Sequence, residues 1–267
     1  MKTKHNFNNI FPLFIFFILV LIFGCKKENS LNAIETASMT DIDGNVYKTV
    51  KIGNQWWMAE NLKVRRYRNG DTIDFVGLIG YNLDSLKWNN INYGAFCIID
   101  NLDSTSKNFN GKKFGFLYNG FTITDSRIIA PAGWHIPTDA EWKTLEIYLG
   151  MSDNEVNKTN WRGSIEGNKL KLQLGWNDLS ENNSNYTLSE QYYIYGTNES
   201  GFSALGGGCC MYNGKWSDPQ TFASGFWWTS SIIDNKILYR YLDYHKPNVF
   251  RYYASKTYGF NIRCVKD

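Results

Sequence analysis

The amino-acid sequence predicts an α+β domain that follows an export signal. Three patterns predict this class: an alternating segment with a turn at Gly53-Asn54, a capped amphipathic helix after Thr138, and short apolar segments divided by glycines after Gly201. Helices early in a domain and strands late in it are typical of α+β folds. The 267 residues suit one large domain or two small ones.

The composition indicates a globular protein and excludes nucleic acid as a partner. Hydrophobic residues make up 43% and charged residues 20%, proportions typical of a folded chain. The formal charge is +3, and Lys2 and Lys4 lie in the export signal, so the mature chain carries about +1 (3 minus 2). No domain-wide basic field remains to attract nucleic acid. Aromatic residues reach 16%, which supplies core volume and also residues for binding surfaces.

The first 24 residues predict a signal peptide. A basic start is followed by about 13 apolar residues from Phe11 to Phe23, too few for a membrane-spanning helix of about 20 residues. The run ends in "LIFGC", which resembles the lipobox of bacterial lipoproteins although Phe23 is bulkier than usual there. The resemblance implies cleavage before Cys25 and lipid attachment to it. An ordinary signal peptide with a free cysteine nearby is the alternative.

The segment after the lipobox predicts how the protein is attached to the membrane. Residues 25–40 are polar and without periodicity, so we expect a lipid anchor followed by a tether, and a domain over residues 41–267. Lys26 is not an aspartate, and by resemblance to lipoprotein sorting rules this favours the bacterial outer membrane. The expected partner is therefore the membrane, through a lipid anchor.

The domain begins, in chain order, with a β-hairpin. Val46, Lys48 and Val50 alternate with the residues between them, Gly53-Asn54 suits a turn, and a second strand starts at Gln55. The irregular residues 72–111 predict long loops, and residues 113–123 predict a strand. Residues 163–174 predict a short second helix, and residues 176–200 another loop. The segments after Gly201 predict several short strands.

The first helix is predicted from the stretch "APAGWHIPTDAEWKTLEIYLG". Thr138 and Glu141 form the pattern of a capping box, and Trp142, Leu145 and Leu149 share one helical face. Gly150 suits the position after the helix end. The acidic residues therefore have structural roles. We expect His135 to bond to a backbone group rather than to act in catalysis.

Seven blocks of the chain resemble one family. In order they are "GNQWWMAENL", "FGFLYNG", "APAGWHIPTDAEWKTLEIYLG", "GNKLK", "SGFSALGGG", "FWWTSS" and "GFNIRCV". Over about Asp41 to Asp267 they resemble the Fibrobacter succinogenes major paralogous domain family of exported bacterial proteins, and two blocks are similar to formylglycine-generating, sulfatase-modifying proteins. The resemblance implies a C-type-lectin-like fold with two helices, a twisted antiparallel sheet and long loops.

The resemblance also bears on the cysteines of the mature domain, which are Cys97, Cys209, Cys210 and Cys264. Many relatives carry a cysteine just before the "PAGW" block, where this chain has Ala130, so Cys264 lacks that partner. Export permits disulfides, and adjacent cysteines rarely bridge each other. Cys97 becomes the predicted partner of Cys264, with Cys209 or Cys210 as rivals.

We expect a non-catalytic binding or adhesion module for glycan or protein ligands, without a cofactor or metal. The cysteine pair that formylglycine chemistry needs is missing between "FWWTSS" and "GFNIRC". The "WND" and "KPN" segments echo lectin calcium motifs, but Lys246 stands where an oxygen ligand is needed. The expected ligand-binding candidates are the tryptophan pairs Trp56, Trp57, Trp227 and Trp228, one member of each pair being core. A structural envelope protein, or an enzyme related to formylglycine-generating proteins, is the alternative.

Overall fold

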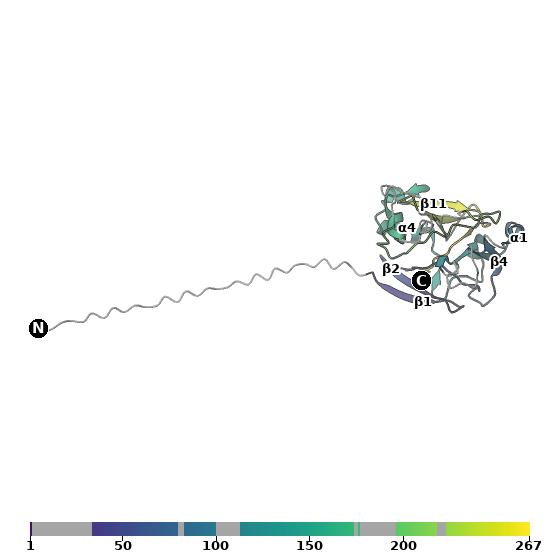
Figure 1. The fold of residues 1–267 in the computed structure, drawn as a ribbon, viewed down its shortest axis with the longest axis horizontal. Coiled ribbons are helices and arrows are strands. Elements are labelled where there is room, and N and C mark those ends of the chain that lie inside the picture. Colours follow the sequence, from purple (N-terminus) through teal and green to yellow (C-terminus); the bar gives the residue numbers. More distant parts are fainter. Residues whose placement is uncertain (2–33, 80–82, 100–112, 174–175, 177–195, 218–222) are drawn as a thin grey trace, which may run out of the picture. The chain divides into compact units, whose positions relative to one another are not determined.

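The computed structural model describes Met1 and residues 34–79, 83–99, 113–173, 176, 196–217 and 223–267 (Figure 1). These residues, apart from Met1, belong to one compact unit that starts at Ile34. The expected signal peptide and Cys25 lie outside the described residues.

The unit contains short strands and short helices. The strands are β1 (Thr36–Thr40), β2 (Val46–Ile52), β3 (Gln55–Met58), β4 (Asp74–Ile79), β5 (Ala95–Ile99), β6 (Phe116–Asn119), β7 (Trp134–His135), β8 (Asn160–Arg162), β9 (Ser224–Ile233), β10 (Lys236–Asp243), β11 (Val249–Ala254), β12 (Gly259–Phe260) and β13 (Val265–Lys266). The helices are α1 (Ser85–Asn90), α3 (Gly120–Ile123), α4 (Asp139–Tyr148), α5 (Asp153–Val156) and α6 (Glu166–Leu170).

The described strands form three sheets rather than one. Their orders are β1-β2-β3-β13-β7, β8-β11-β10-β9 and β12-β6-β5-β4. Neighbouring strands are antiparallel except β4 and β5, which are parallel. Mixed helices and mainly antiparallel sheets confirm the predicted α+β class.

The predicted hairpin is confirmed, and a further strand precedes it. β2 pairs with β3 so that Val50 lies opposite Trp57, and Gly53 has a φ of +60° in the turn. β1 pairs with the other edge of β2. Because β1 lies in the segment expected as a tether, the folded unit begins earlier than the expected boundary at Asp41.

Helix α4 is confirmed with its predicted ends. The Thr138 hydroxyl accepts from the backbone N–H of Glu141, and the Glu141 carboxylate accepts from the backbone N–H of Thr138. Gly150 follows the helix with a φ of +113°. Trp142 is buried against Trp57, with 5.0 Å between ring centroids. The helix therefore packs on the first sheet by the face that its apolar spacing predicts.

Two other expectations are wrong. The second helix, expected over residues 163–174, is the five-residue α6. The loops expected over residues 72–111 contain β4, α1 and β5. Every residue of β5 is buried, so its continuous apolar sequence is that of an enclosed strand, in which no alternation with polar residues is needed.

The buried side chains form three clusters. The main cluster includes Tyr118, Trp228, Phe260, Cys209 and Cys264. The helix cluster lies around α4 and includes Trp57, Trp142 and Trp227. The third cluster lies at the sheet of β5 and includes Trp88, Cys97, Leu117, Cys210 and Trp216. Sheet β8-β11-β10-β9 contributes to the first two, because its faces carry different residues: Trp228 packs in the main cluster and Trp227 in the helix cluster.

Candidate functional site

A row of aromatic rings crosses sheet β8-β11-β10-β9. Trp161 lies opposite Phe250, Phe250 opposite Tyr241, and Tyr241 opposite Phe226. Directly opposed residues project from the same face of a sheet. The ring centroids along the row are 5.2, 5.7 and 4.5 Å apart, so the rings contact one another across all four strands.

A second row lies beside the first on the same face. Tyr239 lies opposite Tyr252 on one side and opposite Trp228 on the other. Phe250 links the rows, with centroids 6.2 Å from Tyr239 and 6.1 Å from Tyr252. We define the aromatic face as the six half-buried rings of this surface, which are Trp161, Phe226, Tyr239, Tyr241, Phe250 and Tyr252.

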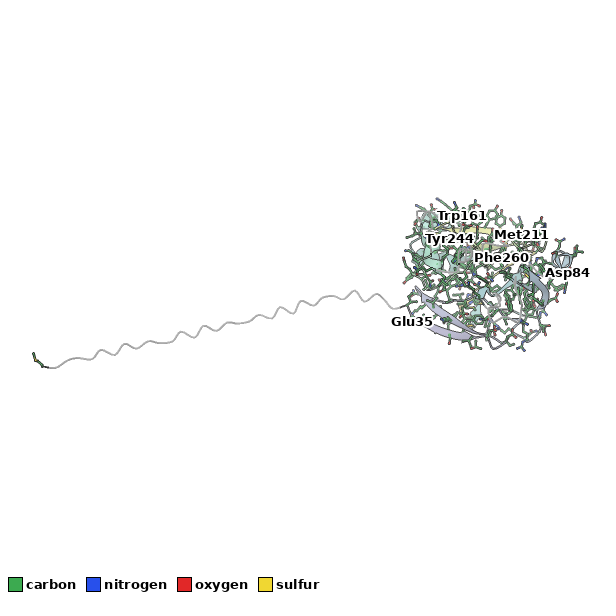
Figure 2. The ribbon with its side chains drawn as sticks, in the orientation of Figure 1. Glu35, Asp84, Trp161, Met211, Tyr244 and Phe260 are labelled. Atoms are coloured by element: carbon green, nitrogen blue, oxygen red, sulfur yellow. The ribbon has the colours of Figure 1, made fainter. Side chains whose placement is uncertain are left out.

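The aromatic face packs against the main cluster at one end. Phe226 stacks on the fully buried Phe260 with centroids 5.2 Å apart, and Tyr239 also packs against this cluster. At the other end, Trp161 belongs to the edge strand β8. Figure 2 shows Trp161 toward the margin of the unit and Phe260 further inside it. The rings are thus anchored at one end and partly accessible along the rest.

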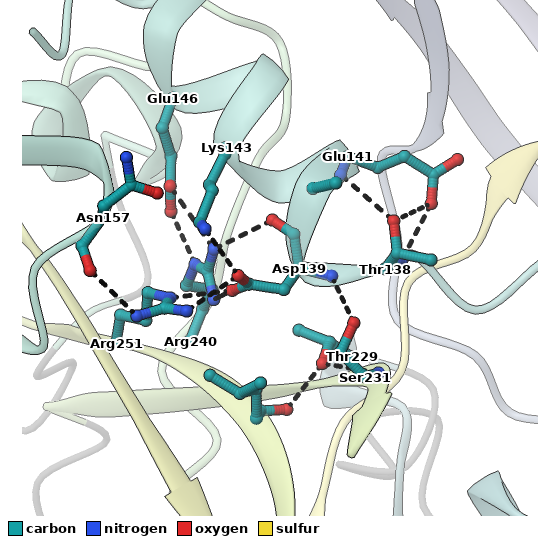
Figure 3. A network of polar contacts seen from close by, with 12 residues as sticks. Thr138, Asp139, Glu141, Lys143, Glu146, Asn157, Thr229, Ser231, Arg240 and Arg251 are labelled. Atoms are coloured by element: carbon teal, nitrogen blue, oxygen red, sulfur yellow. Dashed lines mark hydrogen bonds and ion pairs between the residues drawn. The ribbon is translucent and has the colours of Figure 1, made fainter. Parts of the chain in front are cut away.

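The opposite face of the same sheet carries buried charges (Figure 3). Arg240 lies between Tyr239 and Tyr241 in β10 and therefore projects the other way. Its Nε donates to Glu146 at 2.6 Å and its Nη1 to Asp139 at 2.9 Å, both on α4. Arg251 donates from Nη2 to Asp139 at 2.8 Å, and Arg162 from Nη2 to Glu146 at 2.8 Å.

These charges are structural. Burial acts to raise the pKa of Asp139, but hydrogen bonds and charge from Arg251 and Arg240 outweigh it and hold that pKa well below its usual range. Both Arg240 and Glu146 are fully enclosed, so no solute reaches them in the folded unit. The ion group is defined as Asp139, Glu146, Arg162, Arg240 and Arg251. It joins α4 to β8, β10 and β11, three of the strands that carry the aromatic face.

His135 is held by carboxylates rather than by the backbone group that we expected. Its Nδ1 lies 2.6 Å from Asp267 Oδ1 and its Nε2 lies 2.7 Å from Glu141 Oε1. Burial acts to lower the pKa of His135, but the hydrogen bonds to Asp267 and Glu141 outweigh it, and the pKa is raised. The contact joins the strand β7 to the start of α4. Glu141 lies in the same short stretch as His135, but Asp267 is 132 residues away, and a local sequence pattern could not reveal that contact.

A cavity of about 330 Å³ lies at the end of β1 and the turn that follows it. Its lining residues are Thr40, Asp41, Ile42, Val64, Arg68, Ile129, Ala130, Pro131 and Ala132. Arg68 donates to the carbonyl oxygens of Ala130, Pro131 and Trp134 at 2.9–3.0 Å. Asp41 accepts from Asn45 and Tyr47 and from two backbone N–H groups. Arg68 and Asp41 thus stabilise the backbone segments that line the cavity, through hydrogen bonds to other residues of the chain.

Three of the four tryptophans expected to bind ligand are enclosed. Trp57, Trp227 and Trp228 are completely buried, and only Trp56 is half-buried, against the main cluster. In the first pair one member is core, as predicted. In the second pair both are, because β9 is packed on both faces. Trp227 donates to Asn61 at 2.9 Å and Trp228 to the Tyr118 carbonyl at 2.8 Å.

The sequence contained a signal for the aromatic face that the tryptophan pairs obscured. Tyr239 and Tyr241 alternate with buried residues in "LYRYLD", and Phe250 and Tyr252 alternate with Val249 and Arg251 in "VFRY". An alternating strand with aromatic residues on its less buried face predicts a partly exposed surface lined by aromatic side chains. The pattern does not indicate which strands lie beside each other.

The predicted bridge between Cys97 and Cys264 is not formed. Both are buried and free, Cys97 in the third cluster and Cys264 in the main cluster. Their separation follows from the three-sheet arrangement, in which β5 and β13, the strand that directly follows Cys264, belong to different sheets.

The described part of the chain contains no group of three or more His, Cys, Asp or Glu side chains that could hold a metal ion. Of the "WND" segment, Asn177 and Asp178 lie outside the described residues. Among the helices of the described residues, none is long and apolar enough to span a membrane.

Comparison with known protein families gives a match. A family model described as the Fibrobacter succinogenes major domain matches residues 50–266, which includes all the strands of the aromatic face. No curated protein and no solved structure matches the chain.

Proposed function

The chain belongs to the Fibrobacter succinogenes major domain family, and we propose that it is an exported, non-catalytic binding module for a protein ligand, anchored by lipid at the outer membrane. The aromatic face is the observation that carries this proposal. For the fold we propose a C-type-lectin-like domain. Its support is the capped helix α4, the antiparallel sheets, and the pairing of the late strand β13 with the early strand β3.

The arrangement of the rings favours a protein over a glycan. Sugars stack on free ring faces, but Phe226 and Tyr241 turn their faces to each other, with 4° between planes and 4.5 Å between centroids. Phe226 also stacks on Phe260 at 20°. The faces that these two rings turn to each other are therefore not free for a sugar. Such a surface suits an apolar protein contact better than a sugar platform.

The residue types of the aromatic face also favour a protein ligand. The aromatic face combines one Trp, three Tyr and two Phe. The centres of protein interfaces are rich in aromatic residues and poor in charged ones. The nearest acidic group in these strands, Asp243, accepts a hydrogen bond from the Tyr241 hydroxyl. Arginines of the same strands project to the opposite face, into the ion group. The alternation thus separates an apolar surface from a charged interior.

Site-specific photo-crosslinking tests the binding surface. A photoreactive phenylalanine analogue replaces Tyr252 in the lipidated chain in its native envelope, and a matched variant carries it at Tyr148, an exposed tyrosine on α4. We expect one defined protein adduct at position 252 that position 148 does not give. Phe250→Ser in the same chain should abolish the adduct. A 252 variant that links only to glycan, or links to nothing, would contradict a protein ligand.

The anchor has a separate test. Cys25→Ser should prevent lipid attachment and cleavage at the lipobox, because both require the cysteine at that position. Metabolic labelling with a fatty acid analogue measures lipid attachment. Membrane fractionation shows in which membrane the protein is located. Equal labelling of the variant and the parent chain would show that Cys25 is not the lipidated residue, without affecting the binding surface.

A further inference from the structure

Strand β1 pairs with a neighbour on one side only. It is the first strand of sheet β1-β2-β3-β13-β7 and bonds to β2. Just before β1, the backbone carbonyl of Glu35 accepts from β2, and just after it the backbone N–H of Asp41 donates to the same side, so the odd-numbered residues bond to β2. In an antiparallel pair the residues between them turn both backbone groups away from the partner strand. Within the part of the chain that the structure describes, nothing bonds to these outward groups, which belong to Thr36, Ser38 and Thr40.

The outer edge of β1 is accessible and unprotected. Thr36, Ser38 and Thr40 are exposed, and Figure 1 shows β1 at the margin of the folded unit. Natural proteins commonly protect an edge strand with lysine, proline, a bulge or a covering segment. β1 contains neither lysine nor proline, and its pairing with β2 is regular along its whole length. The edge is therefore a template on which another strand can pair.

The other sheet edges among the described residues are short or covered. β7 and β8 have only two and three residues. Neighbouring segments bond to the outer edges of the other three strands, through the backbone groups of Pro137, Gly208 and Asn261 at β9, Cys210 at β12, and Leu83 and Asp84 at β4. β1 is thus the longest uncovered edge of the described sheets.

We propose that β1 pairs with β1 of a second copy of this chain, antiparallel and centred on Ser38. In this register Ser38 lies opposite Ser38 of the other copy, and Thr36 lies opposite Thr40 at both ends. Each of these pairs can exchange both backbone hydrogen bonds, because all three residues turn their N–H and C=O groups outward. An interface with two-fold symmetry has to be complementary to itself, and a strand pair centred on one residue meets this requirement.

The side chains on either side of β1 fit the same register. Ile34 and Ile42 lie four residues before and four residues after Ser38, and they are 46% and 43% exposed. The pairing brings Ile34 of each copy toward Ile42 of the other and removes apolar surface from water at both ends. Glu35 comes opposite Asp41, but both carboxylates already have partners within their own copy, a lysine of β2 at 2.9 Å for Glu35 and two side chains for Asp41.

The proposed lipid anchor favours a second copy over a different partner, and in this respect the inference rests on the proposed function. Residues 26–33 separate Cys25 from Ile34, and a segment of this length holds the start of the folded unit within about 30 Å of the lipid. Copies anchored in one membrane are confined to a thin layer. The confinement raises the effective concentration of each copy for the next, so a short strand pair suffices to join them.

Cysteine cross-linking of the lipidated chain in its native envelope tests the register. Ser38→Cys places two cysteines at a pair whose Cα atoms are about 5.5 Å apart, a separation that a disulfide spans. We expect a covalent dimer after mild oxidation. Lys48→Cys is the matched control, since Lys48 is exposed and lies directly opposite Ser38 on β2, one strand further from the other copy. It should give no more dimer than the parent chain.

Two further cysteine variants test the direction of the strands. Thr36→Cys and Thr40→Cys should each give no dimer alone, whereas membranes that contain both variants should give the mixed dimer. Adding Ser38→Pro to both should abolish the mixed dimer, because proline has no N–H to donate across the interface. Proline is tolerated on the solvent side of an edge strand, and thermal unfolding checks that the fold is retained. Ser38→Lys is a second disruptive variant, which sets like charges opposite each other.

The outcomes separate this inference from the proposed function. Equal dimer from Ser38→Cys and Lys48→Cys, no dimer from Ser38→Cys, or a dimer from Thr36→Cys alone would overturn the pairing. A photoreactive residue at position 38 that links to a different protein would also overturn it. The Ser38→Cys dimer should decrease when Cys25→Ser removes the anchor. An undiminished dimer in that background would support the pairing and contradict a role for the anchor in it.

Discussion

Arg240 in β10 donates its Nε to the carboxylate of Glu146 in α4 across 2.6 Å, and both side chains are completely buried. On either side of Arg240, Tyr239 and Tyr241 project to the opposite face of the strand and belong to the aromatic face. One strand thus joins the internal ion group to the surface that we propose binds a protein. The helix that the sequence specifies most clearly is fixed to that strand by charge pairs.

The first prediction concerns this pair. Arg240→Met should destabilise the fold by about 3–5 kcal/mol, because it leaves the carboxylates of Asp139 and Glu146 buried with too few partners. Urea unfolding measures the change. Lys143→Met is the matched control, since Lys143 also pairs with Asp139 at 3.0 Å but is partly exposed. We expect no more than about 1 kcal/mol for the control. Equal effects would show that the buried pair has no special role.

The second prediction separates core tryptophans from the aromatic face. Trp227→Ala should cost about 3–5 kcal/mol, because a fully buried ring and its hydrogen bond to Asn61 are lost. Trp161→Ala, on the edge strand and half-buried, should cost about 1 kcal/mol. Thermal unfolding of both variants measures the difference. A Trp161→Ala loss as large as that of Trp227→Ala would place Trp161 in the core and remove it from the proposed surface.

The third prediction tests the start of α4. Thr138→Ala removes the hydroxyl that accepts from Glu141 and should destabilise the fold by about 1 kcal/mol. Thr138→Ser keeps the hydroxyl and should restore most of the stability. Chemical unfolding of the three proteins provides the measurement. If Ser and Ala behave alike, the cap hydroxyl is not what stabilises this helix end.

The fourth prediction is a pH dependence at His135. The raised pKa of His135 stabilises the fold below its ordinary value of 6.5, and this contribution is lost as the pH rises through the raised pKa. Burial acts to raise the pKa of Glu141, but its bonds to Thr138 and His135 outweigh it and lower that pKa. This second contribution is present above the ordinary value of 4.5 and is lost as the pH falls through the lowered pKa.

Both contributions are complete between about pH 4.5 and 6.5. The difference in unfolding midpoint between the parent chain and His135→Gln should be largest in that window and smaller at higher and lower pH. Differential scanning at several pH values measures it. His245→Gln, on an exposed turn, is the control and should not reproduce this profile. A difference that is constant with pH would mean that the ring packs but its charge does not stabilise.

Much of the local structure could be predicted because its causes lie within a few residues. The capping box, the apolar face of α4 and the terminal Gly150 all concern neighbours along one helix. The hairpin of β2 and β3 depends on alternation and on the turn at Gly53. Strand β5 was missed for a local reason too, since a strand buried on both faces has no alternation to detect.

The amino-acid sequence by itself determined the α+β class, the hairpin, helix α4 and the family. Only the tertiary structure decided that Trp227 and Trp228 are both core, that Cys97 and Cys264 lie in different clusters, and that aromatic residues of four strands form one surface. The physical reason is that these features depend on which strands pair. The contact of Trp161 with Phe250 joins β8 to β11 across an interval of 89 residues (250 minus 161), and the register between such distant segments is determined by the packing of the whole unit rather than by any local pattern.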